Sequence, residues 1–125
     1  EIYSVNADIF APCALGGMLN DQTIPKLKAS LVAGAANNQL LEPLHGDLLE
    51  QCGIVYAPDY AANAGGVING CCREMLGWNL ENTLAKTDAI YDTLLTIFAM
   101  SKREKIPTYQ AADKLAEERW QAART

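Results

Sequence analysis

The stretch Leu31-Val32-Ala33-Gly34-Ala35-Ala36-Asn37-Asn38 decides the fold, because a short apolar run passes directly into a loop of small and amide-bearing residues. Residues 8–12 and 53–58 are two further apolar runs of strand length. None of the three alternates polar with apolar side chains, which is typical of parallel strands that are buried on both faces. The three runs therefore predict three parallel strands in an α/β fold.

Helical patterns lie between these runs. The first has Asp21 or Thr23 as its cap and carries apolar residues at helical spacing as far as Leu31. The second covers residues 46–52, and Gly53 follows it in the position that commonly ends a helix. Strands that alternate with helices at this spacing predict a βαβαβ half-sheet with right-handed crossovers.

The second half of the chain has a different pattern. It predicts a helix over residues 67–76 that ends at Gly77, then a long helix over residues 80–105 capped by Asn79, and a last helix capped by Thr108. The apolar residues expected on the inward faces of the last two helices are Leu84, Tyr91, Leu94, Leu95, Phe98, Ala112, Leu115, Ala116 and Trp120.

Length and charge exclude several classes of protein. The chain has 125 residues, half of them hydrophobic, which suffices for one domain with a real core. Its formal charge of −5 argues against nucleic-acid binding, which needs a basic surface. Neither a stretch of about 20 apolar residues nor a signal peptide is present, so we expect a cytoplasmic protein without a membrane partner. Because the chain begins at Glu1 without a methionine, we expect it to be a piece of a longer protein.

Cysteine and histidine usage predicts neither a metal centre nor a catalytic triad. The four cysteines form no C-x-x-C pair, and His45 is the one histidine of the sequence. We expect the cysteines to be buried free thiols, and we expect His45 to be a loop or capping residue at a helix start.

Ligands of open parallel sheets bind beyond the carboxyl ends of the strands. Small residues follow all three predicted strands, and Asn37 and Asn63 add amides that could bind a carboxamide or a ribose hydroxyl. The alternative is that these glycines and asparagines only end strands and turn the chain. The glycine-rich fingerprint that binds the phosphates of a dinucleotide is absent.

At these same loops the sequence resembles the leucine, phenylalanine and valine dehydrogenases, within the wider glutamate dehydrogenase superfamily. The resemblance covers essentially the whole chain in order. The stretches that carry it are residues 8–16, 33–40, 45–47, 53–60, 63–69, 90–93 and 111–119.

The resemblance implies an NAD-dependent enzyme that converts an L-amino acid and water reversibly to the 2-oxo acid, ammonia and NADH. Residues 1–70 would be the second half of a Rossmann-like, doubly wound parallel sheet. Residues 71–125 would be helices that pack on it and towards a substrate domain outside this chain, in a homo-oligomer. The implied NAD-binding residues are Cys13, Ala14, Leu15, Ala36, Asn37 and Asn63, and Ala64, Val67 and Ile68 would wall the side-chain pocket of the substrate.

Departures from the family pattern leave alternatives open. The catalytic lysines and the acid/base aspartate of the family would lie upstream of Glu1, so we assign no catalytic and no metal-binding residue to this segment. Asp47 and Asp59 are interpreted as solvated or capping groups, like Lys26 and Lys28. Residues 69–78 depart from the leucine-type pattern and leave phenylalanine or tryptophan as possible substrates. If the 125 residues were complete, the chain would be a noncatalytic binding or assembly module. The family's cofactor-selecting acidic residue would also lie upstream of Glu1, so NADP is an alternative to NAD.

Overall fold

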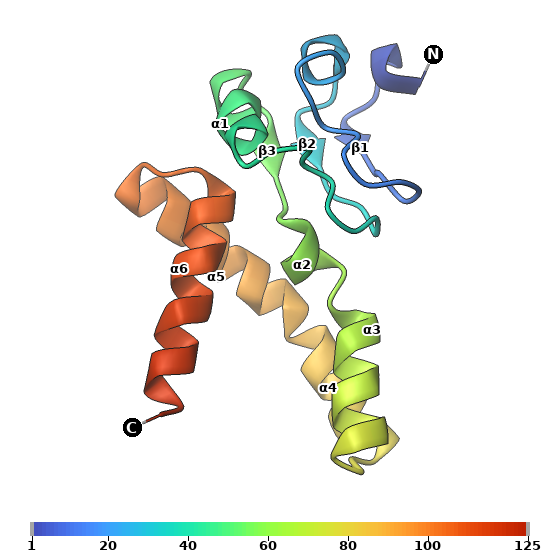
Figure 1. Cartoon of the computed structure of the whole chain (residues 1–125), viewed down its shortest axis with the longest axis vertical. Coiled ribbons are helices and arrows are strands. Elements are labelled where there is room, and N and C mark those ends of the chain that lie inside the picture. The colour runs from blue at the N-terminus through green and yellow to red at the C-terminus, as the bar shows by residue number, and fades with distance from the viewer. Residues whose placement is uncertain (1, 125) are drawn as a thin grey trace.

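The N-terminal half of the protein is built on a sheet of three two-residue parallel strands, β1 (Ile9–Phe10), β2 (Leu31–Val32) and β3 (Val55–Tyr56), in the order β1-β2-β3. We describe it from a computed structural model that covers residues 2–124 (Figure 1). Both strand pairs are parallel, and Ile9, Leu31 and Val55 lie side by side. The predicted three-stranded parallel sheet is therefore confirmed.

The two faces of this sheet differ in burial. Phe10, Val32 and Tyr56 are in register and face a core that also contains Leu19, Ile24 and Leu49. On the other face, the exposed fraction is 56% for Ile9 and 46% for Val55. The prediction that the strands are buried on both faces is wrong for these two residues, because this face of the sheet is largely open to solvent at both positions.

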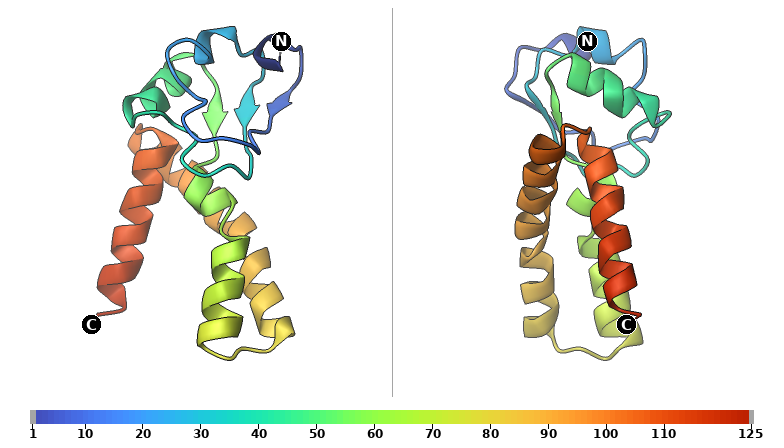
Figure 2. Two further views of the ribbon diagram at one scale, coloured as in Figure 1. Left: turned by 45° about the vertical axis from the view of Figure 1, so that its right-hand side comes forward. Right: turned by 90° about the vertical axis from the view of Figure 1, so that its left-hand side faces the viewer.

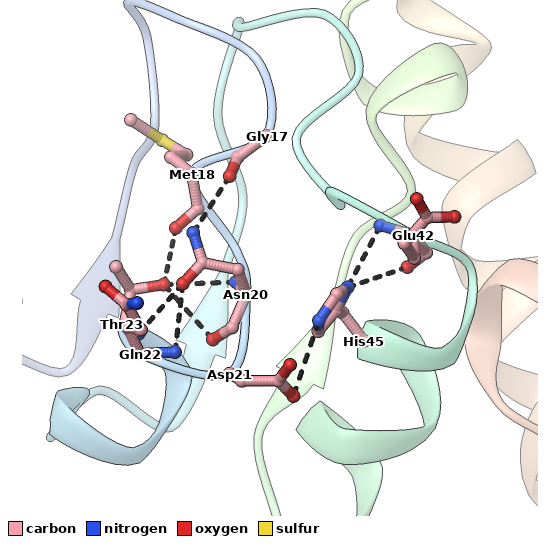
Figure 3. Close-up of polar contacts among 8 residues, drawn as sticks. All are labelled: Gly17, Met18, Asn20, Asp21, Gln22, Thr23, Glu42 and His45. Carbon is pink, nitrogen blue, oxygen red and sulfur yellow. Dashed lines mark hydrogen bonds and ion pairs between the residues drawn. The ribbon is translucent and has the colours of Figure 1, made fainter.

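The helix predicted between the first two strands is reduced to a single turn of 3₁₀ helix, Ile24–Lys26. Side-chain hydrogen bonds organise the preceding turn instead (Figure 3). The Thr23 hydroxyl donates to the Met18 carbonyl oxygen (2.5 Å), and Asn20 Oδ1 accepts the backbone N–H groups of Gln22 and Thr23. Such bonds compete with a helical backbone, and the chain is already extended at Leu27.

The second predicted helix is confirmed as α1 (Leu44–Gln51), which starts two residues before the predicted range. Gly53 has a φ of +71°, a left-handed conformation that glycine adopts without strain, and it turns the chain into β3.

Helices make up the rest of the chain (Figures 1 and 2). The short helices α2 (Asp59–Ala62) and α3 (Gly65–Ile68) come first, and a π-helix (Asn69–Met75) continues α3 without a loop. This continuous helical segment ends close to the predicted Gly77, which has a φ of +69°. Then follow α4 (Leu80–Asp88), α5 (Ile90–Glu104) and α6 (Thr108–Ala122).

The long helix predicted over residues 80–105 is two helices that meet at Ala89. The predicted cap is confirmed, because Asn79 Oδ1 accepts the Asn82 N–H at 2.8 Å. The hydroxyls of Thr83 and Thr87 donate to carbonyl oxygens four residues back, a contact that weakens and bends helices before the break. Pro107, rather than the predicted Thr108, stands at the cap of α6.

The helical core is narrower than the sequence pattern predicts. Ile97, Met100, Ala111 and Ala112 are buried between α5 and α6. Several residues predicted to face inward are instead exposed, namely Leu84, Tyr91, Leu95, Ala116 and Trp120. Leu94, Phe98 and Leu115 are half-buried, so only part of the predicted face enters the core.

The cysteines are unpaired, as expected, but their burial is not as predicted. Cys72 is buried, whereas Cys13, Cys52 and Cys71 are exposed. Three of the four therefore lie in loops or on helix surfaces instead of in a core. Among residues 2–124, no helix combines the length and the hydrophobicity that a bilayer span requires.

Candidate functional site

The loops that follow β1 and β2 lie against each other beyond the carboxyl ends of the strands. The backbone N–H of Gly17 donates to the Asn38 carbonyl oxygen at 2.7 Å, and that of Leu19 donates to Gln39 at 2.9 Å. At the strand ends, the Ala36 N–H donates to the Pro12 carbonyl oxygen at 2.9 Å. Backbone hydrogen bonds therefore hold the two loops as one surface.

Glycine is required where these loops touch. A Cβ atom at Gly34 would lie 2.1 Å from the Pro12 carbonyl oxygen, and one at Gly16 would lie 2.9 Å from that of Asn37. At these two positions the close approach is between two loops of the protein itself. The small residues therefore do more than end strands and turn the chain. At these two positions they allow the two loops to pack against each other.

Asp59 joins the loop after β3 to this surface. Its carboxylate is buried and accepts two backbone N–H groups at 2.6 Å, from Gln39 to Oδ2 and from Tyr60 to Oδ1. The Gln39 side chain in turn donates to the carbonyl oxygens of Gly34 and Ala36 at 2.9 Å. Asp59 is buried and not solvated, and it is the first residue of α2 rather than its N-cap, although its carboxylate accepts an N–H of the first helical turn. Sequence analysis missed Gln39, for which the sequence carries no local signal.

The two asparagines predicted from the sequence meet at this edge of the sheet. Asn63 Nδ2 donates to Asn37 Oδ1 at 2.7 Å, and the carbonyl oxygens of Ala35 and Ala36 lie 3.3 and 3.4 Å from the same nitrogen. Three surrounding oxygens fix the orientation of the Asn63 amide. Its Oδ1 therefore turns away from the loop, and it has no hydrogen bond to another described residue.

The remaining predicted cofactor residues lie next to this pair. Cys13, Ala14 and Leu15 follow β1 and are exposed, with an exposed fraction of 78% for Leu15. Gly16 packs directly against the Asn37 backbone, which brings this loop beside the asparagine pair. Cys13, Ala14, Leu15, Ala36, Asn37 and Asn63 thus gather at one edge of the sheet.

The three predicted substrate-pocket residues do not share one wall. Ala64 and Ile68 line a cavity of about 220 Å³ between α3, α5 and α6. Val67 is not among the residues that line this cavity, and its exposed fraction is 69%. Since Val67 and Ile68 are neighbours on a helix, they face different sides of α3.

Asp59, Tyr56 and Tyr60, three titratable groups near the site, are committed to structural hydrogen bonds. Burial, together with the Asp59 charge, raises the pKa of the Tyr56 phenol, and the Tyr56 oxygen accepts the Asp59 N–H. Burial and a hydrogen bond to Asp113 likewise raise the pKa of Tyr60. Both phenols therefore stay protonated, and the site can bind and orient a ligand better than it can exchange protons with one.

His45 lies apart from this surface, at the start of α1 (Figure 3). Its buried ring accepts the Glu42 N–H at Nδ1 (2.9 Å), so the neutral ring carries its proton on Nε2, which lies 3.5 Å from Asp21 Oδ1. His45 lies close to the predicted helix start, but it is a buried residue inside α1 and not a loop residue, and its Nε2 has no hydrogen bond to another described residue. Among residues 2–124, no group of three or more His, Cys, Asp or Glu side chains could hold a metal ion.

The fold is a parallel three-stranded α/β sheet whose loops gather beyond the carboxyl ends of the strands, followed by helices. The family model "Glutamate/Leucine/Phenylalanine/Valine dehydrogenase" matches residues 1–124. The chain belongs to this family, and the resemblance seen in the sequence is confirmed.

Individual relatives agree with this family assignment. The chain is 58% identical over 124 residues to a leucine dehydrogenase of Geobacillus stearothermophilus, covering 99% of this chain and 34% of that protein. It is 55% identical over 120 residues to an L-tryptophan dehydrogenase of Nostoc punctiforme, covering 95% and 34%. The crystal structure of L-tryptophan dehydrogenase from Nostoc punctiforme superposes with a TM-score of 0.94 at 52% identity, covering 99% of this chain and 37% of that one. The chain thus spans about a third of the length of these relatives.

Proposed function

We propose that the chain is the part of an NAD-dependent L-amino-acid dehydrogenase that binds the nicotinamide end of the cofactor. Residues 1–70 are then the second half of the dinucleotide-binding domain. Residues 71–125 are helices that pack on it and towards a substrate domain, although the chain passes from one part to the other inside the π-helix. A cytoplasmic location remains a prediction.

The observation that carries this proposal is the hydrogen bond between Asn63 and Asn37. It joins the segment after β3 to the loop after β2 at the position where open parallel sheets bind ligands. It also leaves Asn63 Oδ1 directed away from the protein's own loops, as an acceptor that a carboxamide N–H or a ribose hydroxyl could use.

These residues fit a nicotinamide riboside in their chemistry. The exposed Cys13-Ala14-Leu15 loop and the backbone at Ala36 offer a surface of small and apolar groups, and the amides of Asn37 and Asn63 offer polar contacts beside it. When bound, NAD would supply the hydride acceptor. The residues of this chain would bind and orient it, and we assign no catalytic or metal-binding residue to the segment.

We propose an aliphatic L-amino acid, leucine first, as the substrate, with its 2-oxo acid and ammonia as products. The identity to leucine dehydrogenases supports this choice, and the apolar residues Ala64, Val67 and Ile68 are consistent with it. A preference for tryptophan or phenylalanine is the alternative, since the tryptophan enzyme of Nostoc punctiforme is almost as similar in sequence. The small Gly70-Cys71-Cys72 run departs from the leucine-type pattern and is consistent with this alternative.

We also propose that the protein assembles into a homo-oligomer. The observation in favour is the set of large apolar side chains that the helices leave exposed, which includes Leu84, Tyr91, Leu95 and Trp120. Exposed apolar surface of this kind is commonly covered by a partner. The same exposed surface is also consistent with the alternative function, a noncatalytic assembly module. Enzyme assays of the full-length protein distinguish the two functions.

The test measures NADH formation by the full-length protein that carries this chain, with leucine, valine, phenylalanine and tryptophan as substrates. Turnover with an aliphatic or aromatic amino acid is expected, and Asn63→Ala should raise the KM for NAD roughly tenfold, the effect of one lost hydrogen bond. Asn69→Ala, on the exposed surface of the π-helix, is the matched control. NAD reduction with none of the four amino acids would contradict the proposal.

A further inference from the structure

Gln39 is a fully buried glutamine that joins the segments after all three strands. Its carbonyl oxygen accepts the Leu19 N–H of the loop after β1 at 2.9 Å. Its backbone N–H donates to Oδ2 of Asp59, at the start of α2, at 2.6 Å. Its Nε2 donates to the carbonyl oxygens of Gly34 and Ala36, both in the loop after β2, at 2.9 Å. One residue therefore holds together three segments that meet beyond the strands.

The contacts of the Gln39 side chain fix the orientation of its amide. Exchange of Nε2 and Oε1 would place an oxygen against two carbonyl oxygens, so the nitrogen must face the loop after β2. Oε1 is buried and has no hydrogen-bond partner among residues 2–124. A buried acceptor without a partner costs stability. Because an apolar side chain of similar length would avoid this cost, the feature that glutamine adds here is the pair of N–H groups that it directs at this loop.

The Ala36 carbonyl oxygen connects Gln39 to the asparagine pair. This oxygen lies 2.9 Å from Gln39 Nε2 and 3.4 Å from Asn63 Nδ2. A carbonyl oxygen has two lone pairs, so it can accept both donors. Asn63 Nδ2 also donates to Asn37 Oδ1, on the residue that follows Ala36. A shift of the Ala36 peptide would therefore change the orientation of the Asn63 amide.

We infer that Gln39 is a positioning residue that holds the Ala36 peptide and thereby orients the Asn63 amide towards the nicotinamide end of the cofactor. Gln39 is fully buried, so it acts through Asn63 and does not touch the ligand itself. This role rests on the proposed function, because it takes the nicotinamide as the ligand of Asn63. Loss of the two Gln39 side-chain N–H bonds should then weaken cofactor binding even where the fold is retained.

The test is Gln39→Met in the full-length protein that carries this chain. Methionine has a similar length and volume but donates no hydrogen bond. We expect the dissociation constant for NADH, measured by fluorescence titration, and the KM for NAD to rise roughly tenfold, the effect of one lost contact at Asn63. Gln51→Met, the same substitution at an exposed position of α1, is the matched control and should change neither value.

A double-mutant cycle separates positioning from a purely structural role. Since Gln39 acts through Asn63, adding Gln39→Met to Asn63→Ala should raise the NADH dissociation constant by less than about twofold beyond that of Asn63→Ala alone. Leu49→Ala, in the core beneath the sheet, should lower the urea midpoint more than Gln39→Met does and leave NADH binding unchanged. Gln39→Met should change the midpoint less, because it removes the unpartnered Oε1 together with the two donors.

Unchanged NADH affinity in Gln39→Met, or a loss of affinity that adds in full to that of Asn63→Ala, would overturn the inference. If Gln39→Met does not fold, Gln39→Glu takes its place. A protonated carboxyl keeps one donor for the loop and an ionised one keeps none, so the NADH affinity of Gln39→Glu should fall as the pH rises. The same pH dependence in the unaltered protein would overturn the inference.

The outcome for the unaltered protein distinguishes this role from the proposed function. Absence of both NADH binding and NAD reduction in the unaltered protein would reject the proposed function, and the role of Gln39 with it. Turnover of an amino acid with NAD that Gln39→Met leaves unchanged would reject the role of Gln39 alone.

Discussion

The sheet region and the helical region of this protein are stabilised in different ways. Around the sheet, three two-residue strands contribute little regular structure, and the loops are joined by hydrogen bonds that the buried Asp59 carboxylate accepts and the buried Gln39 side chain donates. In the helical region, α5 and α6 are regular over fifteen residues each and pack through the small residues Ala111 and Ala112.

This difference indicates which region of the protein is suited to bind a ligand. A surface built from loops can present backbone groups and amides to a ligand, provided that buried polar side chains fix its shape. The helical region is tied by apolar contacts and by ion pairs at its surface, such as Lys114 Nζ to Glu104 Oε2 at 2.6 Å. We therefore expect substitutions that add or remove a few atoms in the loops to lower stability strongly. We expect substitutions on the surface of the helices to change stability little.

The largest effect is expected for Gly34→Ala. Its Cβ would lie 2.1 Å from a backbone oxygen, so the loops after β1 and β2 would have to separate, at a cost of about 3 kcal/mol of unfolding free energy. Urea denaturation measures this cost. Gly66→Ala is the matched control, because no atom lies within 4 Å of its Cβ position, and alanine there should stabilise the helix slightly. Equal stability of the two variants would contradict the described loop contact.

A smaller effect is expected for Asp59→Asn. An amide can accept only one of the two N–H groups that the carboxylate accepts, so one buried donor loses its partner, at a cost of about 2 kcal/mol. The denaturation midpoint should fall, and hydrogen exchange of the Gln39 or Tyr60 amide should accelerate. Asp8→Asn, an exposed carboxylate of the same region, should change neither. Unchanged exchange at both amides would show that Asp59 does not organise the surface.

The smallest effect is expected for Glu104→Gln, at the surface of the helical region. Hydrogen bonds from Lys114 and Arg103 hold the pKa of this carboxyl below its usual value of 4.5. Its contribution to stability is therefore present above that value and is lost as the pH falls through the lower folded-state pKa. Glu104→Gln should be slightly less stable than the unaltered protein near neutral pH, and the difference should vanish in acid.

Urea midpoints measured across this pH range check the prediction. Glu118→Gln, an exposed glutamate of α6, is the control and should show no such pH dependence. A difference that persists unchanged in acid would mean that the Glu104 charge does not stabilise the contact between α5 and α6.

Local sequence signals were reliable where one residue determines the local backbone. The positive φ of Gly53 and Gly77 and the cap at Asn79 were read directly from residue type and position. The turn at Asn20 and Thr23 was mistaken for a helix start, because the same residues that cap helices can instead close a turn with their side chains. The break at Ala89 was missed, because apolar periodicity continues across it.

By itself, the sequence determined that this protein has three parallel strands with a helix before the third strand and helices after it, and that its amide-bearing loops follow the strands. The preferences of residues for strands, turns and helix caps depend on neighbours in the sequence, so a single sequence is enough to predict these elements. Only the tertiary structure decided that Asn63 forms a hydrogen bond with Asn37 and that the buried Asp59 carboxylate accepts the Gln39 backbone N–H. It also decided that Ile68 lines the cavity between the helices whereas Val67 does not. Those facts depend on contacts between segments twenty or more residues apart, or on which face of a helix its neighbours cover, and no local pattern encodes either.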